Sequence, residues 1–329
     1  MKVLSLFDGM SCGQIALNKA EVNIDKYYAA EVDNYAITVT QANYPNTIQL
    51  GDVCKVKGAD LPKIDLLIGG SPCQGFSFAG KQLNFEDPRS ALFFEYVRIL
   101  AELRVKNPDI YFLLENVRMK KESQDVITEY LGVEPIEINS ALVSAQNRRR
   151  LYWTNIEGIE QPEDKGILLR DILEFEGAGV IKNMGDLKDN GDKSQCLDAN
   201  YFKGADNHGQ RTLISLPLGR YADAYDITAR FNAKKPGTLA FSKSRGSIRT
   251  INDKSKTLLG GGQNISNSGA TNIKIGERYR TLSPLECELL QTVPDNYTNH
   301  VSNTQRYKML GNGWTVDVIT HIFKNMFYL

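Results

Sequence analysis

Long apolar runs are missing from this 329-residue sequence, in which no stretch approaches the roughly 20 residues that a helix needs to cross a bilayer. The opening residues, MKVLSLFDG, also lack the layout of a signal peptide. We therefore expect no membrane partner and a location in the cytoplasm.

Cysteine and histidine are scarce as well. The five cysteines form no CxxC pair, and the three histidines show no metal-ligand spacing. This distribution argues against a disulfide framework and a metal site, and it favours a reducing compartment. The 39 basic residues balance 39 acidic residues, so any nucleic-acid binding must come from local patches rather than bulk charge.

The residues that are present begin with the pattern of an α/β fold. The start of the chain predicts a strand at 3–7, a glycine turn at 8–13, a helix at 14–20 and a strand at 27–31. Glu31 lies 22 residues after Gly9, and an acid at about that distance suits ribose hydroxyls. Because the turn is not GxGxxG, a nucleoside-like ligand is favoured over a dinucleotide. A plain glycine turn is the alternative.

A third unit follows, with a short strand at 46–50 that ends at Gly51 and Asp52. Asp52 could accept a hydrogen bond from an adenine amino group. It could equally cap the start of a helix.

The stretch Lys63–Ser77, KIDLLIGGSPCQGFS, carries the strongest signal for chemistry. A buried strand at 64–68 is followed by two glycines, and proline then stiffens the turn that presents Cys73. The carboxyl end of a strand is where open α/β sheets place their ligands. A buried structural cysteine is the alternative. Residues 75–88 predict a loop, and an apolar face at 92–100 predicts a helix.

Charged residues then end two further extended segments. Glu115 follows a strand at 111–114, on the same edge as Cys73 if the sheet is doubly wound, although a solvated cap is the alternative. Residues 139–144 and 146–153 also look extended. Alternation along a strand would place Gln146, Arg148 and Arg150 on one face. These arginines could form a solvated edge, or they could reach a phosphate or a base oxygen.

The middle of the chain has a different composition. Residues 155–275 are rich in Gly, Asn, Ser, Asp and Lys and predict a second domain of short strands and loops. Residues 227–260 contain eight basic residues and only one acidic residue. This excess of positive charge favours contact with a polyanion over a merely solvated face. Residues 1–154 and 276–329 are expected to form one domain.

Helical periodicity returns near residue 279. Ser283 and Glu286 predict a capping box for a helix that runs to about residue 291. Residues 310–314 predict a second glycine turn. The last helix carries apolar residues at i, i+3, i+4 and i+7, and we expect it to fold back onto the first domain.

Taken together, these motifs resemble those of the C5-cytosine DNA methyltransferases of bacteria and phages. The resemblance rests on Phe7-Asp8-Gly9 with Gly13, Glu31, Gly51-Asp52, the Gly-Ser-Pro-Cys-Gln-Gly-Phe-Ser loop, Glu115-Asn116-Val117, Gln146-x-Arg148-x-Arg150, the Arg280–Pro294 segment and Gly311-Asn312. It implies a doubly wound, mostly parallel Rossmann-like catalytic domain and, over 155–275, a target recognition domain. One departure is Gly313-Trp314, where most bacterial members have Ser-Val.

The resemblance also implies a chemistry. Cys73 would attack C6 of a cytosine flipped out of double-stranded DNA, so that C5 can take the methyl group of S-adenosylmethionine. Glu115 would hydrogen-bond ring N3 and the exocyclic amine, and Arg150 would hold O2. Arg148 would support Glu115 or a phosphate.

Two further sets of residues follow from the same resemblance. The expected cofactor contacts are Phe7, Gly9, Met10, Glu31, Val32, Asp52, Val53, Pro72, Leu92, Asn312 and Trp314. The expected DNA contacts are Gln74, Ser77, Arg245, Arg249, Thr257 and Leu258, with Thr238-Leu239 as a second candidate for the last pair.

Other classes of protein stay open at this point. A non-catalytic relative would have no need for the thiol, and the Cys-Phe-Thr signature of the branch that methylates tRNA is absent. A nicotinamide oxidoreductase lacks support because no GxGxxG follows the first strand. We expect a monomer on DNA, with a cognate restriction endonuclease as a purely functional partner if one exists.

Overall fold

The computed structural model describes residues 1–71, 91–174, 179–181, 193–203, 212–216, 239–242, 247–250, 272–273 and 278–327. Several residues of the expected site lie outside these ranges, and what the sequence predicts for them stays a prediction. They are Pro72, Cys73, Gln74, Ser77, Thr238, Arg245, Thr257 and Leu258.

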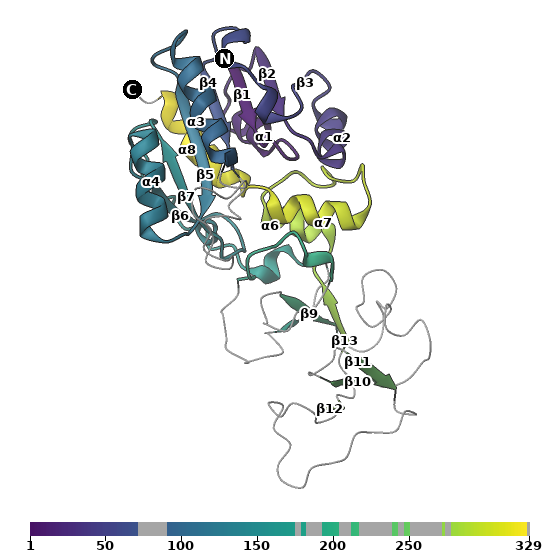
Figure 1. Ribbon diagram of the computed structural model, residues 1–329. Coiled ribbons are helices and arrows are strands. Elements are labelled where there is room, and N and C mark those ends of the chain that lie inside the picture. Colours follow the sequence, from purple (N-terminus) through teal and green to yellow (C-terminus); the bar gives the residue numbers. More distant parts are fainter. Residues whose placement is uncertain are drawn as a thin grey trace.

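A seven-stranded sheet forms the centre of the molecule, with strand order β3-β2-β1-β4-β5-β7-β6 (Figure 1). The strands β1 to β5 run parallel, and β7 pairs antiparallel with both β5 and β6. This confirms the predicted doubly wound, mostly parallel sheet. The strands are β1 Lys2–Leu6, β2 Lys26–Ala30, β3 Ile48–Gln49, β4 Leu66–Gly69, β5 Tyr111–Val117, β6 Ile136–Asn139 and β7 Arg149–Thr154.

Helices cover both faces of this sheet because successive strand residues point to opposite sides. On β5, Leu113 joins the core beneath α1 (Cys12–Lys19) and α8 (Val316–Lys324), while Phe112 and Leu114 join the core beneath α3 (Ala91–Arg104) and α4 (Lys121–Leu131). All three side chains are fully buried. Both cores therefore draw on the same strands, as expected for parallel sheets. The remaining α-helices of the described residues are α2 Asn34–Asn43, α6 Pro284–Leu290 and α7 Asn303–Asn312.

The end of the chain completes the first core, as predicted. The Ser283 side chain accepts from the Glu286 N–H and the Glu286 carboxylate accepts from the Ser283 N–H, which forms the expected capping box of α6. The apolar face of α8 is buried against α1. The predicted glycine turn at 310–314 is wrong in part, because α7 continues through Asn312 and only Gly313 begins the turn.

A second correction concerns the approach to β7. Residues 140–142 form a short 3-10 helix in place of the predicted extended segment at 139–144. The cause is Asn139, whose side-chain oxygen accepts from the N–H groups of Ala141 and Arg148, at 3.1 Å each. The asparagine thereby closes a turn that brings residues 146–148 alongside the sheet.

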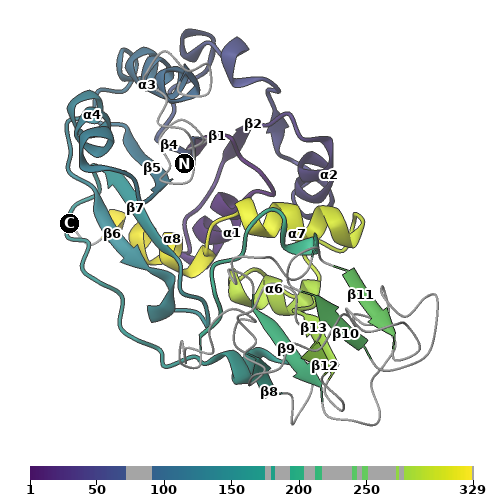
Figure 2. The same cartoon turned by 60° about the horizontal axis from the view of Figure 1, so that its bottom comes forward.

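The middle of the chain contributes two small antiparallel sheets, seen beside α6 and α7 in Figure 2. One contains β8 (Gly179–Ile181), β9 (Leu213–Leu216) and β13 (Arg278–Thr281), and the other contains β10 (Leu239–Ser242), β11 (Ser247–Thr250) and β12 (Asn272–Ile273). Short strands were predicted here, while the domain boundaries at 154 and 275 stay predictions. Among the described residues, no helix is long and apolar enough to span a bilayer.

Candidate active site

The ends of β4 and β5 meet at one point of the sheet edge. Their register pairs Gly69 with Leu114, so Glu115 follows beside Gly70. A Cβ on Gly70 would lie 3.1 Å from Glu115 Oε2 and 3.0 Å from the indole nitrogen of Trp314. A side chain at position 70 would therefore press on both groups, and each would have to shift by a few tenths of an ångström.

The strand β5 continues beyond its parallel partner. It was predicted to end at Leu114, but antiparallel pairing with β7 extends it to Val117. The side-chain amide of Asn116 donates to the Ser71 hydroxyl (3.3 Å) and carbonyl (3.4 Å). These bonds hold the last described residue before Cys73 against the strand that carries Glu115.

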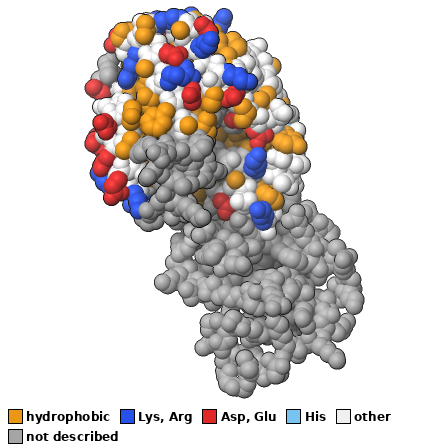
Figure 3. All heavy atoms as spheres, viewed as in Figure 1, with side chains coloured by type: hydrophobic (Ala, Val, Ile, Leu, Met, Phe, Trp, Pro, Cys, Tyr) orange, Lys and Arg blue, Asp and Glu red, His pale blue; other side chains and the backbone are white. Residues whose placement is uncertain are grey.

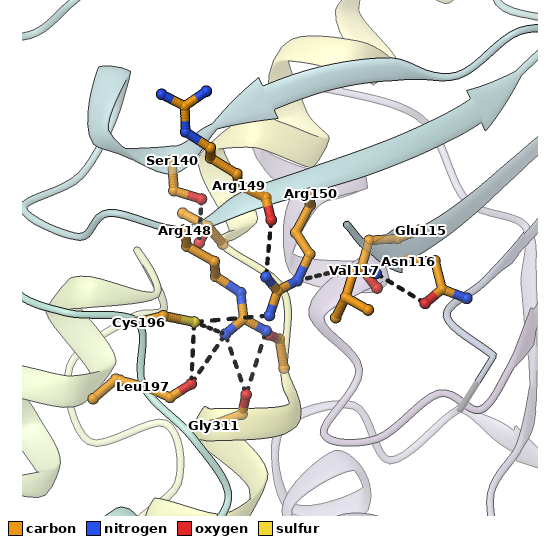
Figure 4. Close-up of polar contacts among 12 residues, drawn as sticks. Glu115, Asn116, Val117, Ser140, Arg148, Arg149, Arg150, Cys196, Leu197 and Gly311 are labelled. Carbon is orange, nitrogen blue, oxygen red and sulfur yellow. Dashed lines mark hydrogen bonds and ion pairs between the residues drawn. The ribbon is translucent and has the colours of Figure 1, made fainter. Parts of the chain in front are cut away.

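An ion pair joins Glu115 to β7 (Figure 4). Arg150 Nε lies 3.0 Å from Glu115 Oε1, and the side chains are only 15% and 12% exposed. Burial alone would lower the pKa of Arg150, but the Glu115 carboxylate, together with Cys196 and Tyr152, outweighs burial and raises that pKa above its usual value. The guanidinium therefore stays charged, and Glu115 keeps its second oxygen on the side of Gly70 and Trp314.

Arg148 points in the same direction as Arg150, but the oxygen atoms that it binds are different (Figure 4). Its guanidinium donates to the carbonyls of Leu197, Gly311 and Gly313 at 2.9–3.3 Å, and the residue is 4% exposed. The predicted support of Glu115 by Arg148 is therefore not what the structure contains, since Arg150 makes that contact. Arg148 instead ties the turn after α7 to the segment around Leu197.

The predicted alternation before and along β7 is confirmed. Gln146 and Arg148 are buried, whereas Asn147 and Arg149 are exposed. Arg149 points away from the site, toward an ion pair with Glu137 at 3.0 Å (Figure 4). The Gln146 amide bonds to the Leu290 carbonyl at 3.2 Å and accepts from the Leu197 N–H at 3.0 Å, so it serves as an internal cross-link.

The glycine turn after β1 lies at the same sheet edge. Gly9 has a φ of +58°, and a Cβ built on it would meet nothing within 4 Å, so the backbone is open to a ligand. Glu31 follows β2 and accepts the N–H of Gly9 at 2.7 Å, of Val32 at 2.7 Å and of Asp33 at 2.8 Å. The Val32 side chain is 69% exposed. An acceptor and an exposed apolar side chain thus stand beside an open turn.

The other expected cofactor contacts vary in accessibility. Asp52 caps the short helix Val53–Lys55 by accepting from Cys54 N–H at 3.0 Å, so the capping alternative is confirmed while an adenine contact stays a prediction. Asn312 is exposed, whereas Met10 is 1% exposed and packs in the core beneath the turn. Phe7, Leu92 and Trp314 are partly buried, and Val53 is buried.

Three features escaped the sequence-based predictions. Cys196 lies against both arginines, Gly311 packs directly on the backbone at Asp198, and Asp8 is buried. Burial raises the pKa of Asp8 to about 6. Asp8 stood in the quoted motif without a role, and no spacing rule connects Cys196 with residues 148 and 150. These contacts become visible only in three dimensions.

On the face shown in Figure 3, acidic side chains gather along the left edge, while basic and acidic side chains are mixed over the rest of the described residues. Arg249 lies on β11, opposite Ala240 of β10. No group of three or more His, Cys, Asp or Glu residues is arranged to hold a metal ion within the ranges described above.

Comparisons with known proteins find relatives that match this chain over nearly its whole length. The chain is 29% identical to the type II methyltransferase M1.ScrFI of Lactococcus lactis subsp. cremoris, over 99% of this chain and 77% of that protein. It is 28% identical to the type II methyltransferase M.NlaX of Neisseria lactamica, over 99% and 96%. The solved structure of the methyltransferase EhMeth of Entamoeba histolytica shares the fold, with a TM-score of 0.63 and 14% identity over 99% of this chain and 98% of that one.

The sequence model of one protein family spans nearly the whole chain. This family is described as C-5 cytosine-specific DNA methylase, and the match covers residues 1–328. The chain therefore belongs to the C-5 cytosine-specific DNA methylases, enzymes that use S-adenosylmethionine to methylate C5 of cytosine in DNA.

Proposed function

We propose that this enzyme methylates a cytosine that is flipped out of a specific short sequence in double-stranded DNA, through a covalent bond between Cys73 and C6 of the base. The observation that carries the proposal is the Glu115–Arg150 pair beside Gly70, three positions before Cys73. A carboxylate and a guanidinium are thus available next to the nucleophile's strand end.

Glu115 and Arg150 are suited to hold the edge of a cytosine. Glu115 Oε1 is occupied by Arg150, while Oε2 can accept from the exocyclic amine or from protonated N3. Arg150 has five N–H donors, of which three are used, by Glu115, the Arg149 carbonyl and Cys196. The two left can donate to O2 of the base. Charge that develops on the ring would then be met by fixed partners.

We assign Arg148 a different role from Arg150. Its burial and its bonds to three carbonyls argue against contact with a phosphate. It would position the turn that begins at Gly313, and with it Trp314.

The edge formed by β1, β2 and β3 fits the adenosyl part of the cofactor. Glu31 uses three of about four acceptor positions of a carboxylate, which leaves capacity for a ribose hydroxyl. Val32 offers an exposed apolar surface for a base, and the open backbone at Gly9 allows close approach. Met10 could contribute only through its backbone. When bound, S-adenosylmethionine supplies an electrophilic methyl group.

Covalent attack explains why the site needs a thiol. The Cys73 thiolate forms a bond to C6, and the electron pair displaced from the C5–C6 double bond makes C5 nucleophilic. After methylation a base removes the C5 proton, the electron pair reforms the double bond and the sulfur leaves C6. Flipping the base costs a few kcal/mol. Binding contributed by Gln74, Ser77, Arg245, Arg249, Thr257 and Leu258 would offset that cost.

Mapping of methylated cytosines at single-base resolution tests the proposal. Unmethylated DNA is incubated with S-adenosylmethionine and the wild-type enzyme, Cys73→Ala or Cys54→Ala, the last a control at an exposed thiol. We expect one short motif to be methylated at C5 by wild type and by Cys54→Ala, and no methylation by Cys73→Ala. Normal methylation by Cys73→Ala would rule out the covalent route, and methylation without a sequence motif would rule out specific recognition.

A further inference from the structure

The thiol of Cys196 lies between the two arginines of the site (Figure 4). Its sulfur is 3.2 Å from Arg148 Nη1 and 3.8 Å from Arg150 Nη2. It comes from residues 193–203, hereafter the docking segment, which belong to the middle of the chain. A residue outside the strands of the large sheet thus touches the guanidinium that binds Glu115.

Backbone pairing fixes the docking segment on one side of Cys196. The Ser194 N–H donates to the Ala145 carbonyl at 2.8 Å, and the Ser194 carbonyl accepts from the Asn147 N–H at 3.0 Å. One residue beyond Cys196, the Leu197 N–H donates to the Gln146 side chain. The segment therefore adds a short strand-like pairing next to residues 145–147, and the position of the sulfur follows from it.

Close packing fixes the other side. A Cβ on Gly311 would lie 2.2 Å from the carbonyl carbon of Asp198 and 2.5 Å from the nitrogen of Ala199. The absence of a side chain at Gly311 lets the segment cross the end of α7 at this distance. Because Arg148 binds the carbonyls of both Leu197 and Gly311, the same guanidinium closes the junction.

The charges around the sulfur favour its interaction with the arginines. Burial would raise the pKa of the Cys196 thiol, but Arg148 and Arg150 outweigh burial and hold that pKa below its usual value. Glu115 stands on the far side of Arg150 and balances part of the positive charge. A sulfur with anionic character makes a stronger acceptor for a guanidinium N–H than a neutral thiol does.

We propose that Cys196 is a positioning residue of the methyl-transfer site: its sulfur orients the Arg150 guanidinium toward Glu115 and makes that orientation depend on the docking segment. The inference rests on the proposed role of Glu115 and Arg150 in holding the base. Cys196 does not touch the base and forms no covalent intermediate. It acts through Arg150, in the way that outer hydrogen-bond partners orient ligating side chains.

Three variants separate positioning from simple packing. Cys196→Ala removes the acceptor, Cys196→Ser keeps a weak acceptor that does not ionise, and Ser194→Ala alters a buried hydroxyl in the same segment that bonds the Gln195 carbonyl. Steady-state rates on DNA are measured with saturating S-adenosylmethionine, together with the KM for the cofactor and the thermal unfolding temperature.

We expect Cys196→Ala to lower kcat by roughly tenfold to a hundredfold, the usual effect of losing a hydrogen bond to a charged group. Cys196→Ser should recover part of the loss, while Ser194→Ala should leave kcat unchanged. The KM for S-adenosylmethionine should stay the same in all three. A fall in unfolding temperature with wild-type kcat, or equal losses of kcat in Cys196→Ala and Ser194→Ala, would overturn the proposal.

A second measurement keeps the inference separate from the proposed function. The ultraviolet absorbance of thiolate is followed against pH, and the curve of a Cys196→Ser protein is subtracted from that of the matching protein with Cys196. This difference is measured once in the otherwise wild-type enzyme and once in enzyme that also carries Arg148→Met. We expect a thiolate that forms below the usual thiol pKa, with a midpoint that rises in Arg148→Met. An unchanged midpoint would refute the arginine–sulfur interaction, whereas absence of DNA methylation in every protein would refute only the proposed function.

Discussion

Two carboxylates at one edge of the sheet are held in different ways. The Glu31 carboxylate accepts hydrogen bonds from the backbone N–H groups of Gly9, Val32 and Asp33. Glu115 is held by the side chain of Arg150, which in turn meets Cys196, 46 residues further along the chain. The proposed cofactor end of the site is therefore built from local backbone, and the proposed base end from side chains that distant segments bring together.

The largest expected effect comes from breaking the base end. Glu115→Gln removes the carboxylate that would stabilise the protonated ring, and it leaves the buried Arg150 without its counter-charge. We expect kcat to fall by roughly 10²- to 10⁴-fold, with an unchanged dissociation constant for S-adenosylmethionine. Single-turnover methylation and calorimetric titration of the cofactor measure the two quantities.

The ion pair of Glu137 with Arg149 supplies a matched control. It has the same 3.0 Å separation on the neighbouring strand, but its arginine is 58% exposed and points away from the site. Glu137→Gln should leave kcat within about twofold, since exposed ion pairs contribute little. Equal losses in both variants would show that strand pairing, and not the placement of Glu115, governs the rate.

Glu31→Gln breaks the cofactor end and should give the opposite kinetic pattern. A glutamine presents one acceptor oxygen and an NH₂ group, so at least one of the three backbone N–H bonds is lost. We expect the KM for S-adenosylmethionine to rise roughly tenfold to a hundredfold, with kcat unchanged once the cofactor saturates. Glu129→Gln, on the exposed side of α4, is the control. A drop in kcat at saturation would contradict the division between the two ends.

Gly311→Ala tests whether the base end depends on the docking segment. The new Cβ would overlap the Asp198–Ala199 backbone at 2.2–2.5 Å, so that backbone must move. We expect a loss of about 3 kcal/mol in unfolding free energy and a lower kcat, with cofactor affinity retained. Chemical denaturation and cofactor titration measure both, with Thr304→Ala on the exposed face of α7 as the control. Wild-type stability would mean that the segment adapts freely.

The smallest expected effect is a pH dependence of stability that comes from Asp8, in the glycine turn after β1. Burial raises the pKa of Asp8 from 3.8 to about 6, so its contribution to stability is complete below pH 4 and is lost as pH rises through 6. That loss is at most about 3 kcal/mol. Asp8→Asn keeps an acceptor for the Tyr27 hydroxyl, which donates to Oδ1 at 2.8 Å. Urea unfolding is measured from pH 4 to 7. The unfolding free energy of the variant should rise relative to that of wild type across this range. A difference in unfolding free energy that stays constant with pH would contradict the assignment.

The local parts of the fold followed from sequence alone. The capping box of Ser283 and Glu286 and the glycine turn before α1 both depend on neighbours a few residues away. Glu31 belongs to this class, because the turn that it binds lies in the same βα unit. Sequence patterns encode such interactions directly.

The partners of the arginines could not be derived in this way. Alternation along the strand placed Arg148 and Arg150 on one face. It could not predict which carbonyl oxygens and which sulfur these arginines would contact. The extension of β5 through Val117 likewise depends on pairing with β7, which a propensity argument cannot see. Residue types signal that chemistry is present, whereas long-range topology decides which side chain meets which.

The packing of α8 on α1 has a consequence for the order of events during synthesis. Lys19 on α1 bonds Asp317 of α8, 298 residues further along the chain. At roughly 5 to 20 residues per second, the ribosome would need about 15 to 60 seconds to deliver that partner. Throughout this interval, α8 is missing from the apolar side of the nascent sheet that it shares with α1. Translation speed and chaperone supply would therefore influence how much of the enzyme reaches its native state.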